Sequence, residues 1–426
     1  MVEGPWCGPE TMRILHINNY HFPRGGSDRY FLDVARGLAE RGHEVRTLAP
    51  VDPRDINVDL RVDASIVPML TSMKPRPTEI ARFFYSTVVR EVVRRVVADF
   101  MPDIVHLHIY YGQMTSSILH PMKVAGIPIV QTLHEYKIVC PAQTMLRDQR
   151  LCTACRGGRY WHAALHKCNR GSLLRSALSA AEAVVSEALG ARRHVDRFLT
   201  VSDFQRTQLL SMGIDAGKTI RLYNFTDDVD APSTSPGDYF LFAGRLVAGK
   251  GLETLLRAYK LYRDLCATTA IPLYLAGEGD AESELRRLAE DLGVIGSVTW
   301  LGHIAGDDLE HSYRNCRALV NPSEFNETFG LNNLEAMAYG RPVICSDGGA
   351  FPEVVRNGID GFVVSTGNVA EFADRMCELT VERALKMGEQ AHERAMSVFS
   401  KDVHLSKLER IYASTVKDVS SNQKTK

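Results

Sequence analysis

Short apolar runs alternate with amphipathic stretches along the first half of the chain. The apolar run 13–18 leads into a loop with Gly25 and Gly26, and apolar residues then recur at helical spacing over 27–41. A second apolar run follows over 44–49. A strand, a helix and a strand within about 40 residues form a βαβ unit, which predicts a parallel sheet.

The same alternation continues beyond this unit. Apolar residues recur four apart over 80–100 and predict a single helix there. The runs 103–108, 127–132 and 197–202 predict three more strands, and a helix is expected to begin near Asp203. The first half of the chain therefore predicts one parallel sheet covered by helices.

A second series of strands and helices follows a polar stretch that contains two prolines, 223–237, which is the predicted domain linker. The fold class we expect is α/β, with two Rossmann-like, doubly wound parallel-sheet domains that face each other across a cleft. In such sheets ligands bind at the carboxyl ends of the strands. The strands predicted in the second series are 239–243, 272–276, 298–302, 318–322 and 342–345.

Composition narrows the class of protein. The chain has 426 residues, of which 45% are hydrophobic and 24% charged, with a net charge of −1. This balance excludes a disordered chain and argues against a nucleic-acid binder that relies on bulk positive charge. No apolar run reaches the roughly 18 residues of a membrane span. The first ten residues lack the features of a signal peptide, so we expect a cytoplasmic protein.

Two cations follow the first strand of the second series. Arg245 and Lys250 stand in the sequence Gly244-Arg245-Leu246, followed by Lys250-Gly251, and they flank a predicted helix start. Arginine offers a planar fork to phosphate oxygens, lysine offers a point charge, and a helix N-terminus adds N–H donors, so the pattern suits a diphosphate. The alternative is that both are solvated surface cations.

Two glutamates lie eight residues apart around a short glycine-containing sequence. If Glu327 precedes a helix and Glu335 lies about two turns into it, both can face one cleft. Carboxylates accept hydrogen bonds from sugar and ribose hydroxyls. Between them, Phe329-Gly330-Leu331 lets backbone N–H groups approach a phosphate. The alternative is two exposed glutamates on a helix.

Taken together, these residues resemble the retaining glycosyltransferases of the GT-B architecture, family 4, over nearly the whole chain. The family's E-x7-E motif stands here as Glu327 and Glu335, and its G-R-L-x-x-x-K-G motif as Gly244 to Gly251. The resemblance implies that Arg245 and Lys250 clamp the donor diphosphate.

The resemblance also implies roles for the neighbouring residues. Glu335 would hold the ribose, and Glu327 the hydroxyls of the transferred sugar. Backbone contacts with the donor are also implied. Ile304 would lie near the base, and Phe329, Gly330 and Leu331 near the phosphate or the sugar. Gly244, which opens the first motif, would also contact the donor. It implies no cofactor for catalysis.

Two features of the first half fit the same resemblance. Gly25-Gly26 resembles the family's N-terminal glycine loop, which passes close to phosphate and acceptor; the alternative is a simple turn. His134 follows a predicted strand where the family has a histidine near the transferred sugar. It would orient the donor, or stabilise the cationic sugar through its backbone carbonyl; the alternative is a structural histidine.

The domain boundaries follow from the strand series and the resemblance. Residues 12–222 are expected to form an acceptor-side domain with a cysteine-bearing insertion at 140–170. Residues 223–400 are expected to form the nucleotide-sugar-binding domain. Residues 401–426 would then form a C-terminal helix and tail, and the helix is expected to return to the first domain.

Four of the nine cysteines lie close together with the spacing C-x11-C-x2-C-x12-C: Cys140, Cys152, Cys155 and Cys168. Four thiolates with a central C-x2-C are typical of a structural zinc site. Unligated or redox-active thiols are the alternative. Arginines and a lysine are interleaved with the cysteines. These basic residues either bind an acidic acceptor such as a lipid phosphate or form a solvated basic loop.

The predicted helix over 80–100 carries Arg82, Arg90, Arg94 and Arg95 against its apolar stripe. This pattern fits either peripheral contact with the inner face of a membrane or a core helix with a polar back.

The function expected from the sequence is transfer of a sugar, with retention, from a nucleotide-diphosphate sugar to a glycan or glycolipid acceptor. Polysaccharide or cell-envelope glycan synthesis is the expected setting. The alternatives are a nucleotide-sugar phosphorylase or epimerase of the same architecture, and a zinc-stabilised module that binds nucleic acid. The near-neutral charge disfavours the last, and we expect no nucleic-acid partner.

Overall fold

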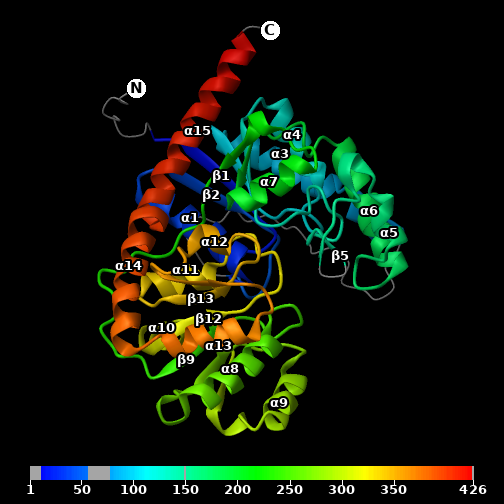
Figure 1. The fold of residues 1–426 in the computed structure, drawn as a ribbon. Helices are drawn as coiled ribbons and strands as arrows, with labels where there is room; N and C mark the ends of the chain where they lie inside the picture. Colours follow the sequence, from blue (N-terminus) through cyan, green and yellow to red (C-terminus); the bar gives the residue numbers. More distant parts are fainter. Residues whose placement is uncertain (1–10, 56–76, 148–149, 425–426) are drawn as a thin grey trace. The chain divides into compact units, whose positions relative to one another are not determined.

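The computed structural model describes residues 11–55, 77–147 and 150–424, and within them the chain divides into two compact units (Figure 1). The first unit comprises residues up to Val201, Arg206–Leu222 and Leu405 onward. The second comprises Ser202–Gln205 and Tyr223–His404. The polar stretch 223–237, predicted as a linker, belongs to the second unit.

The first unit is built on a six-stranded parallel sheet with the strand order β2-β1-β3-β4-β7-β8. The order reverses between β1 and β3, so the sheet has a switch point there, where doubly wound sheets bind ligands. The strands are β1 (Arg13–Ile17), β2 (Glu44–Leu48), β3 (Ile104–Leu107), β4 (Ile129–Leu133), β7 (Arg197–Thr200) and β8 (Thr219–Arg221).

Helices connect these strands because the apolar residues between them recur at helical spacing. The predicted single helix over 80–100 is wrong: two helices stand there, and the break falls at Ser86. Ser86 adopts an extended backbone, and its side chain accepts a hydrogen bond from the N–H of Val89, which caps the second helix. The helices are α1 (Gly26–Glu40), α2 (Pro77–Phe84), α3 (Thr87–Phe100), α4 (Leu119–Val124), α6 (Leu173–Ala188) and α7 (Asp203–Ser211).

The apolar stripe of α3 lies in the core of the first unit. Val89, Val93 and Phe100 are at most 2% exposed, while Arg94 and Arg95 on the opposite face pair with Glu91. The stripe is therefore that of a core helix with a polar back, and not a surface for peripheral contact with a membrane. Among the described residues, no helix combines the length and the apolarity needed to span a membrane.

The second unit contains its own six-stranded parallel sheet, with the order β11-β10-β9-β12-β13-β14 and a switch point between β9 and β12. Its strands are β9 (Tyr239–Ala243), β10 (Leu273–Ala276), β11 (Val298–Gly302), β12 (Cys316–Asn321), β13 (Val343–Ser346) and β14 (Gly361–Val364). Its helices are α8 (Leu252–Cys266), α9 (Glu282–Asp291), α10 (Asp307–Asn315), α11 (Leu331–Ala338), α12 (Phe351–Val354), α13 (Val369–Glu378) and α14 (Val381–Phe399).

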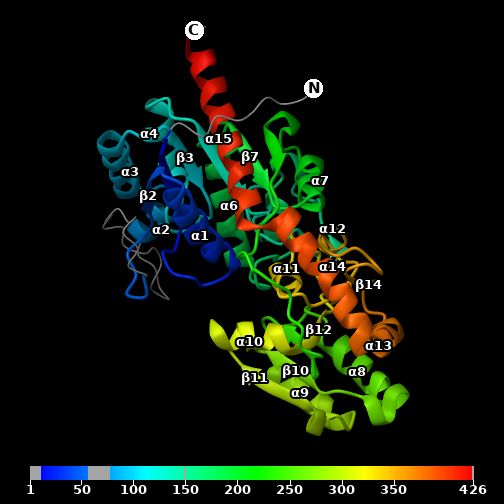
Figure 2. The same cartoon turned by 90° about the vertical axis from the view of Figure 1, so that its left-hand side faces the viewer.

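The C-terminal helix α15 (Lys401–Lys424) returns to the first unit, as predicted, and both ribbon views show it running along that unit (Figure 2). Three of the contacts that anchor it are made by its buried side chains. Buried Glu409 accepts from Arg41 at 2.9 Å and lies 3.2 Å from the His43 ring nitrogen. The Tyr412 hydroxyl lies 2.6 Å from His106 Nδ1. The predicted segment 401–426 extends two residues beyond those described.

The insertion predicted at 140–170 consists of short elements between β4 and α6. A hairpin of two-residue strands, β5 (Leu146–Arg147) and β6 (Arg150–Leu151), is followed by a 3-10 turn over Arg156–Gly158 and by α5 (Trp161–Leu165). Asp148 and Gln149 lie outside the described residues. Helix α5 packs against α6, beside which it lies in Figure 1.

Candidate active site

Three loops interlock at the carboxyl edge of the second sheet. Gly251 ends the loop after β9 and has a positive φ of 70°; a Cβ there would lie 2.0 Å from the carbonyl oxygen of Pro322. The N–H of Glu324, after β12, donates to the carbonyl of Gly249 at 2.9 Å. The N–H of Ala350, after β13, donates to the carbonyl of Glu327 at 2.9 Å.

This packing brings two motifs together that are 77 positions apart in the sequence. The Lys250 ammonium donates to Glu327 Oε1 at 2.6 Å, and the buried Ser323 hydroxyl donates to the same oxygen at 3.0 Å. Lys250 follows β9 and Glu327 follows β12, so their contact spans the switch point of the sheet. The geometry fits a site in which a cation and a hydrogen-bond acceptor face one ligand.

Arg245 stands in the same loop as Lys250 and has no such partner. Its side chain is exposed, and the guanidinium forms no hydrogen bond or ion pair with any residue in the described ranges. Gly244, which precedes it, lies at the end of β9 and donates its N–H to the carbonyl of Ala276 at 2.8 Å. A guanidinium without a protein carboxylate is available to an anionic ligand.

Phe329, Gly330 and Leu331 lie at the start of α11. The Phe329 side chain is buried, with ring centroids 6.0 Å from Tyr223 and 5.9 Å from Phe399, so only its backbone can face a ligand. Gly330 caps the helix with a φ of 98°, and a Cβ there would lie 2.5 Å from the Phe351 ring. The N–H group of Asn333 donates to the carbonyl of Gly330 at 3.1 Å. The N–H groups of Leu331 and Asn332 remain at the helix start, where anions bind.

Glu335 lies one turn into α11, not about two turns as expected from the sequence, and contacts α10. Its Oε2 accepts a hydrogen bond from the hydroxyl of the buried Tyr313 at 2.8 Å. Tyr313 therefore fixes the orientation of a carboxylate that is half-exposed. Sequence reasoning missed Tyr313, because nothing in its local sequence marks it as a neighbour of Glu335. Ile304 follows β11 and is half-buried at the same carboxyl edge, two strands from β9.

In the first unit His134 follows β4 and ends a chain of imidazoles. His134 Nε2 lies 3.3 Å from His108 Nδ1, and His108 Nε2 lies 3.1 Å from His16 Nδ1. Burial, reinforced by the neighbouring imidazoles, holds the pKa of His108 well below its usual range. Burial lowers the pKa of His16 to about 3. The imidazoles of His108 and His16 are therefore neutral, so each has one donor and one acceptor nitrogen. Nε2 of His16 is buried without a hydrogen-bond partner among the described residues.

A third buried histidine, His106, lies beside this chain. One nitrogen each of His16, His106 and His108 lie within 4.8 Å of one another, a spacing that raises the question of a metal. The rings of His106 and His108 are stacked at 4.3 Å, so their in-plane lone pairs run side by side instead of converging. His106 also contacts two hydroxyls, those of Tyr412 at 2.6 Å and Thr132 at 2.7 Å. The cluster fits a hydrogen-bonded stack better than a metal site.

The glycine loop of the first unit lies close to His134. Gly25 caps α1, Gly26 is its first residue, and the Tyr30 ring one turn later lies 4.9 Å from the His134 ring. Gly25 has an extended φ of −165°, and a Cβ there would meet nothing within 4 Å. The fold itself therefore does not require glycine at this position.

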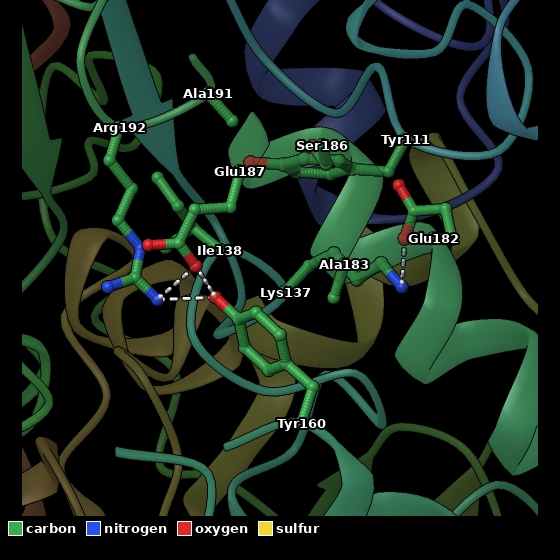
Figure 3. Close-up of a pocket in the computed structure, with 10 residues that line it drawn as sticks. All are labelled: Tyr111, Lys137, Ile138, Tyr160, Glu182, Ala183, Ser186, Glu187, Ala191 and Arg192. Atoms are coloured by element: carbon green, nitrogen blue, oxygen red, sulfur yellow. Dashed lines mark hydrogen bonds and ion pairs between the residues drawn. The ribbon is translucent and has the colours of Figure 1, made fainter. Parts of the chain in front are cut away.

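Glu135, next to His134, is a site residue that sequence reasoning missed. Its Oε1 is buried without a hydrogen-bond partner among the described residues. Burial raises the pKa of Glu135 to about 7, although Lys137 opposes the rise. Lys137 is itself buried and paired with Glu182 at 2.8 Å, as Figure 3 shows. A carboxyl group that titrates near neutrality next to His134 can exchange a proton at working pH.

Two doubly wound parallel sheets, with a cation–carboxylate pair at the switch point of the second, are typical of glycosyltransferases of the GT-B type. The profile described as "Glycosyl transferases group 1" matches residues 226–395, and that described as "Glycosyl transferase 4-like domain" matches residues 25–224. The chain belongs to this family of glycosyltransferases and is a hexosyltransferase, EC 2.4.

Curated relatives align with the chain over most of its length. It is 28% identical to a phosphatidyl-myo-inositol mannosyltransferase of Mycobacterium leprae, across 94% of this chain and 96% of the relative. It is 26% identical to a D-inositol 3-phosphate glycosyltransferase of Pseudarthrobacter chlorophenolicus, across 88% and 86%.

Solved structures share the fold at lower identity. Sucrose-phosphate synthase from Thermosynechococcus elongatus superimposes with a TM-score of 0.68 at 19% identity, covering 95% of this chain and 98% of that one. Anabaena Alr3699/HepE in complex with UDP and glucose gives a TM-score of 0.65 at 19% identity, covering 95% and 100%.

The open space at Gly25 leads to a prediction. The substitution Gly25→Ala should leave thermal stability unchanged, because both the backbone angle and the space accept a methyl group. It should lower kcat/KM by at least about tenfold, because the methyl occupies the path of a closely approaching ligand. Gly296→Ala is the matched control, since Gly296 also has nothing within 4 Å of a Cβ. Unchanged kcat/KM in Gly25→Ala would show that no ligand approaches this backbone.

The raised pKa of Glu135 predicts a pH-dependent stability. Between pH 4.5 and about 7 this carboxyl keeps its proton in the folded protein but loses it in the unfolded chain, so its contribution destabilises the fold as pH rises. Glu135→Gln should remove this loss. Its free energy of unfolding relative to wild type should therefore increase by about 1–3 kcal/mol from pH 5 to pH 8. Urea titrations at both pH values measure the difference.

Glu44→Gln is the control for this comparison, because Glu44 is exposed on β2. A constant difference between Glu135→Gln and wild type at the two pH values would show that the carboxyl group titrates normally.

Proposed function

We propose that this chain transfers a hexosyl group, with retention, from a nucleotide-diphosphate sugar to a glycan or glycolipid acceptor. The observation that carries the proposal is the Lys250–Glu327 contact of 2.6 Å at the switch point, beside the unpaired Arg245. Cleavage of the donor places negative charge on the leaving diphosphate and positive character on the sugar carbon. A site of this kind accelerates transfer by stabilising both charges.

The residues of the second unit divide between the two parts of the donor. Arg245, Lys250 and the N–H groups at the start of α11 bind the diphosphate, because all three present positive charge or donors. Glu327 accepts hydrogen bonds from the sugar hydroxyls while it keeps Lys250 in place. Glu335, oriented by Tyr313, accepts from the ribose hydroxyls.

The comparisons support the donor and acceptor classes. The named relatives transfer sugars to inositol phosphate or to a phosphatidylinositol lipid, and one structural neighbour holds UDP and glucose. They favour a nucleotide-diphosphate hexose as donor and a hydroxyl of a phosphate-bearing acceptor. The setting in the proposal is cytoplasmic synthesis of a polysaccharide or cell-envelope glycan. No cofactor is needed for this chemistry in the proposal.

The test is binding and turnover by an arginine variant. Arg245→Ala should weaken the binding of a nucleoside diphosphate by about 10- to 100-fold, the value of a charge-assisted hydrogen bond, with the fold intact. Calorimetry with UDP and GDP measures this loss. Arg257→Ala, at an exposed position on α8, is the matched control. Equal affinities in Arg245→Ala and wild type would overturn the assigned role.

The products distinguish the alternative enzymes. Transfer to an added acceptor, with an anomeric proton of unchanged configuration by NMR, supports the proposal. Release of sugar phosphate only when inorganic phosphate is added would indicate a phosphorylase, and isomerised donor without acceptor would indicate an epimerase.

A lipid-linked acceptor requires contact with a membrane, and the insertion offers a surface for it. Four exposed apolar side chains stand on α5 and the start of α6: Trp161 at 58%, Leu165 at 62%, Leu173 at 57% and Leu174 at 71%. The surrounding sequence is basic, with Lys167, Arg170 and Arg175. Apolar side chains among cations suit the interface of an anionic bilayer.

Vesicle sedimentation tests this surface. The double variant Trp161→Ala with Leu165→Ala should lower binding to vesicles containing phosphatidylglycerol by at least about tenfold. The reason is that it removes the apolar side-chain area that would be buried in the bilayer on binding. Leu265→Ala is the control, since Leu265 is 58% exposed on α8 of the other unit. Equal binding by the double variant and wild type would exclude this surface.

A further inference from the structure

The first unit contains a polar cavity of about 570 Å³. Its walls come mainly from the loops that follow β3 and β4, from the last residues of the insertion and from the start of α6. Doubly wound sheets bind ligands at the carboxyl ends of their strands, and small-molecule sites commonly have volumes of about 300–1,000 Å³. None of the donor-binding residues of the second unit lines this cavity. It is therefore a candidate site for a second ligand.

One wall of the cavity lies close to His134. Lys137 is on this wall, three residues after His134, and three residues span at most about 11 Å. Gln143, also on the wall, is tied to the same turn, because its carbonyl accepts a hydrogen bond from the N–H of Tyr136 at 3.0 Å. A molecule in the cavity is therefore near the histidine that follows β4.

A buried ion pair forms part of the same wall. Lys137 pairs with Glu182 at 2.8 Å, as Figure 3 shows, and both side chains are at most 8% exposed. Lys137 also donates to the carbonyl of Pro141 at 3.3 Å. An ammonium has three N–H donors, and the third has no partner in the described ranges. A buried donor without a partner is costly, so the wall offers one hydrogen bond to a ligand.

The cavity carries two uncompensated positive charges. Arg170 and Arg175 line it and are exposed, and neither guanidinium forms a hydrogen bond or ion pair with any described residue. The charges of Lys137 and Glu182 offset each other. Cys168, also on the wall, is a free thiol whose pKa is raised by burial, so it stays neutral. Two available guanidinium groups suit a phosphate, whose oxygens accept paired hydrogen bonds from each.

Backbone strain is concentrated at this cavity. Seven non-glycine residues have a positive φ in the described ranges, and two of them, Gln143 at 72° and Arg170 at 52°, line it from different loops. Such strain persists only where the surroundings fix it, and it gathers at ligand sites. Asn169, next to Arg170, is held to α6 by its N–H on Ser176 Oγ at 2.9 Å and its Nδ2 on Ser179 Oγ at 2.8 Å. The fold therefore holds Arg170 at the cavity against its backbone preference.

We propose that this cavity binds the phosphorylated part of the acceptor, with the phosphate on Arg170 and Arg175 and neighbouring hydroxyls on Lys137 and Gln143. The inference rests on the proposed transfer of a sugar, and it assigns the selection of the acceptor to the insertion and the start of α6. The hydroxyl that receives the sugar then lies on the side of the cavity nearest His134.

Two sources can supply this chemistry. A soluble polyol phosphate and a lipid headgroup both carry a phosphate next to hydroxyls. Leu173 and Leu174 are exposed and stand in the sequence between the two arginines, so an acyl chain would find an apolar surface beside the phosphate. The experiment therefore includes both sources.

Calorimetry with the full-length protein tests the soluble source. Wild type should bind D-inositol 3-phosphate, and the double variant Arg170→Ala with Arg175→Ala should bind it at least about tenfold more weakly, because each guanidinium contributes charge-assisted hydrogen bonds. The affinity of the double variant for UDP should be unchanged. Arg156→Ala is the matched control, since Arg156 is exposed on the same insertion but does not line the cavity.

Vesicle sedimentation tests the lipid source. The double variant should lose at least about tenfold in binding to vesicles that contain phosphatidylinositol. It should lose less on vesicles with the same charge of phosphatidylserine, because that headgroup carries no hydroxyls for the cavity. A loss with D-inositol 3-phosphate, or a larger loss on phosphatidylinositol than on phosphatidylserine, supports the proposal and identifies the source. No loss with D-inositol 3-phosphate together with equal effects on the two lipids would overturn it.

Arg170→Gly separates a binding role from a structural one. Glycine adopts a φ of 52° without strain, so this variant should keep or raise the melting temperature of wild type. It should still lose at least about tenfold in affinity for the phosphorylated probe that wild type binds, because the guanidinium is gone. A lower melting temperature with unchanged affinity would show that Arg170 serves only the fold.

The UDP readout keeps this proposal distinct from the proposed function. UDP affinity is expected to depend on Arg245, and affinity for the phosphorylated probe on Arg170 and Arg175. Binding of the phosphorylated probe without sugar transfer would contradict the proposed function and leave the cavity assignment standing. Loss of UDP affinity in the double variant would place the two arginines at the donor and overturn the cavity assignment.

Discussion

The contact between Lys250 and Glu327 depends on a constraint of the whole second sheet. All six strands are parallel, so every strand ends at the same edge, and the order reverses only between β9 and β12. Loops that follow these two strands leave in opposite directions, and side chains from both can meet only at this place. The ion pair, the exposed guanidinium of Arg245 and the first turn of α11 are consequences of that single reversal.

Much of this arrangement could be predicted from the sequence. Apolar runs identified ten of the twelve strands of the two sheets, because parallel strands are buried on both faces, and β8 and β14 were missed. The spacing of Glu327 and Glu335 placed them around a helix start. The break at Ser86 was missed because the apolar stripe continues across it, while a side-chain cap ends one helix and starts the next. Tyr313, Glu135 and the histidine stack were missed because their neighbours are set by tertiary register, which no local pattern records.

The two units use buried polar groups differently. In the second unit charged side chains meet at a partly open edge, where Lys250 and Glu327 are each about one-fifth exposed. In the first unit neutral imidazoles stack within the sheet, and Tyr412 of the terminal helix closes the stack. A charge pair can exchange its partner for a ligand, whereas a buried chain of hydrogen-bonded imidazoles keeps His134 in one orientation.

The path of α15 also determines when each part of the protein can be completed during synthesis. The second unit is almost contiguous in sequence, but the first needs the segment from Leu405 onward, which supplies partners to Arg41, His43 and His106. The part made first on the ribosome is therefore the part finished last. Until α15 has been synthesised, Arg41, His43 and His106 of the amino-terminal half lack their partners and are exposed to solvent. Chaperones should therefore bind mainly to that half of the nascent chain.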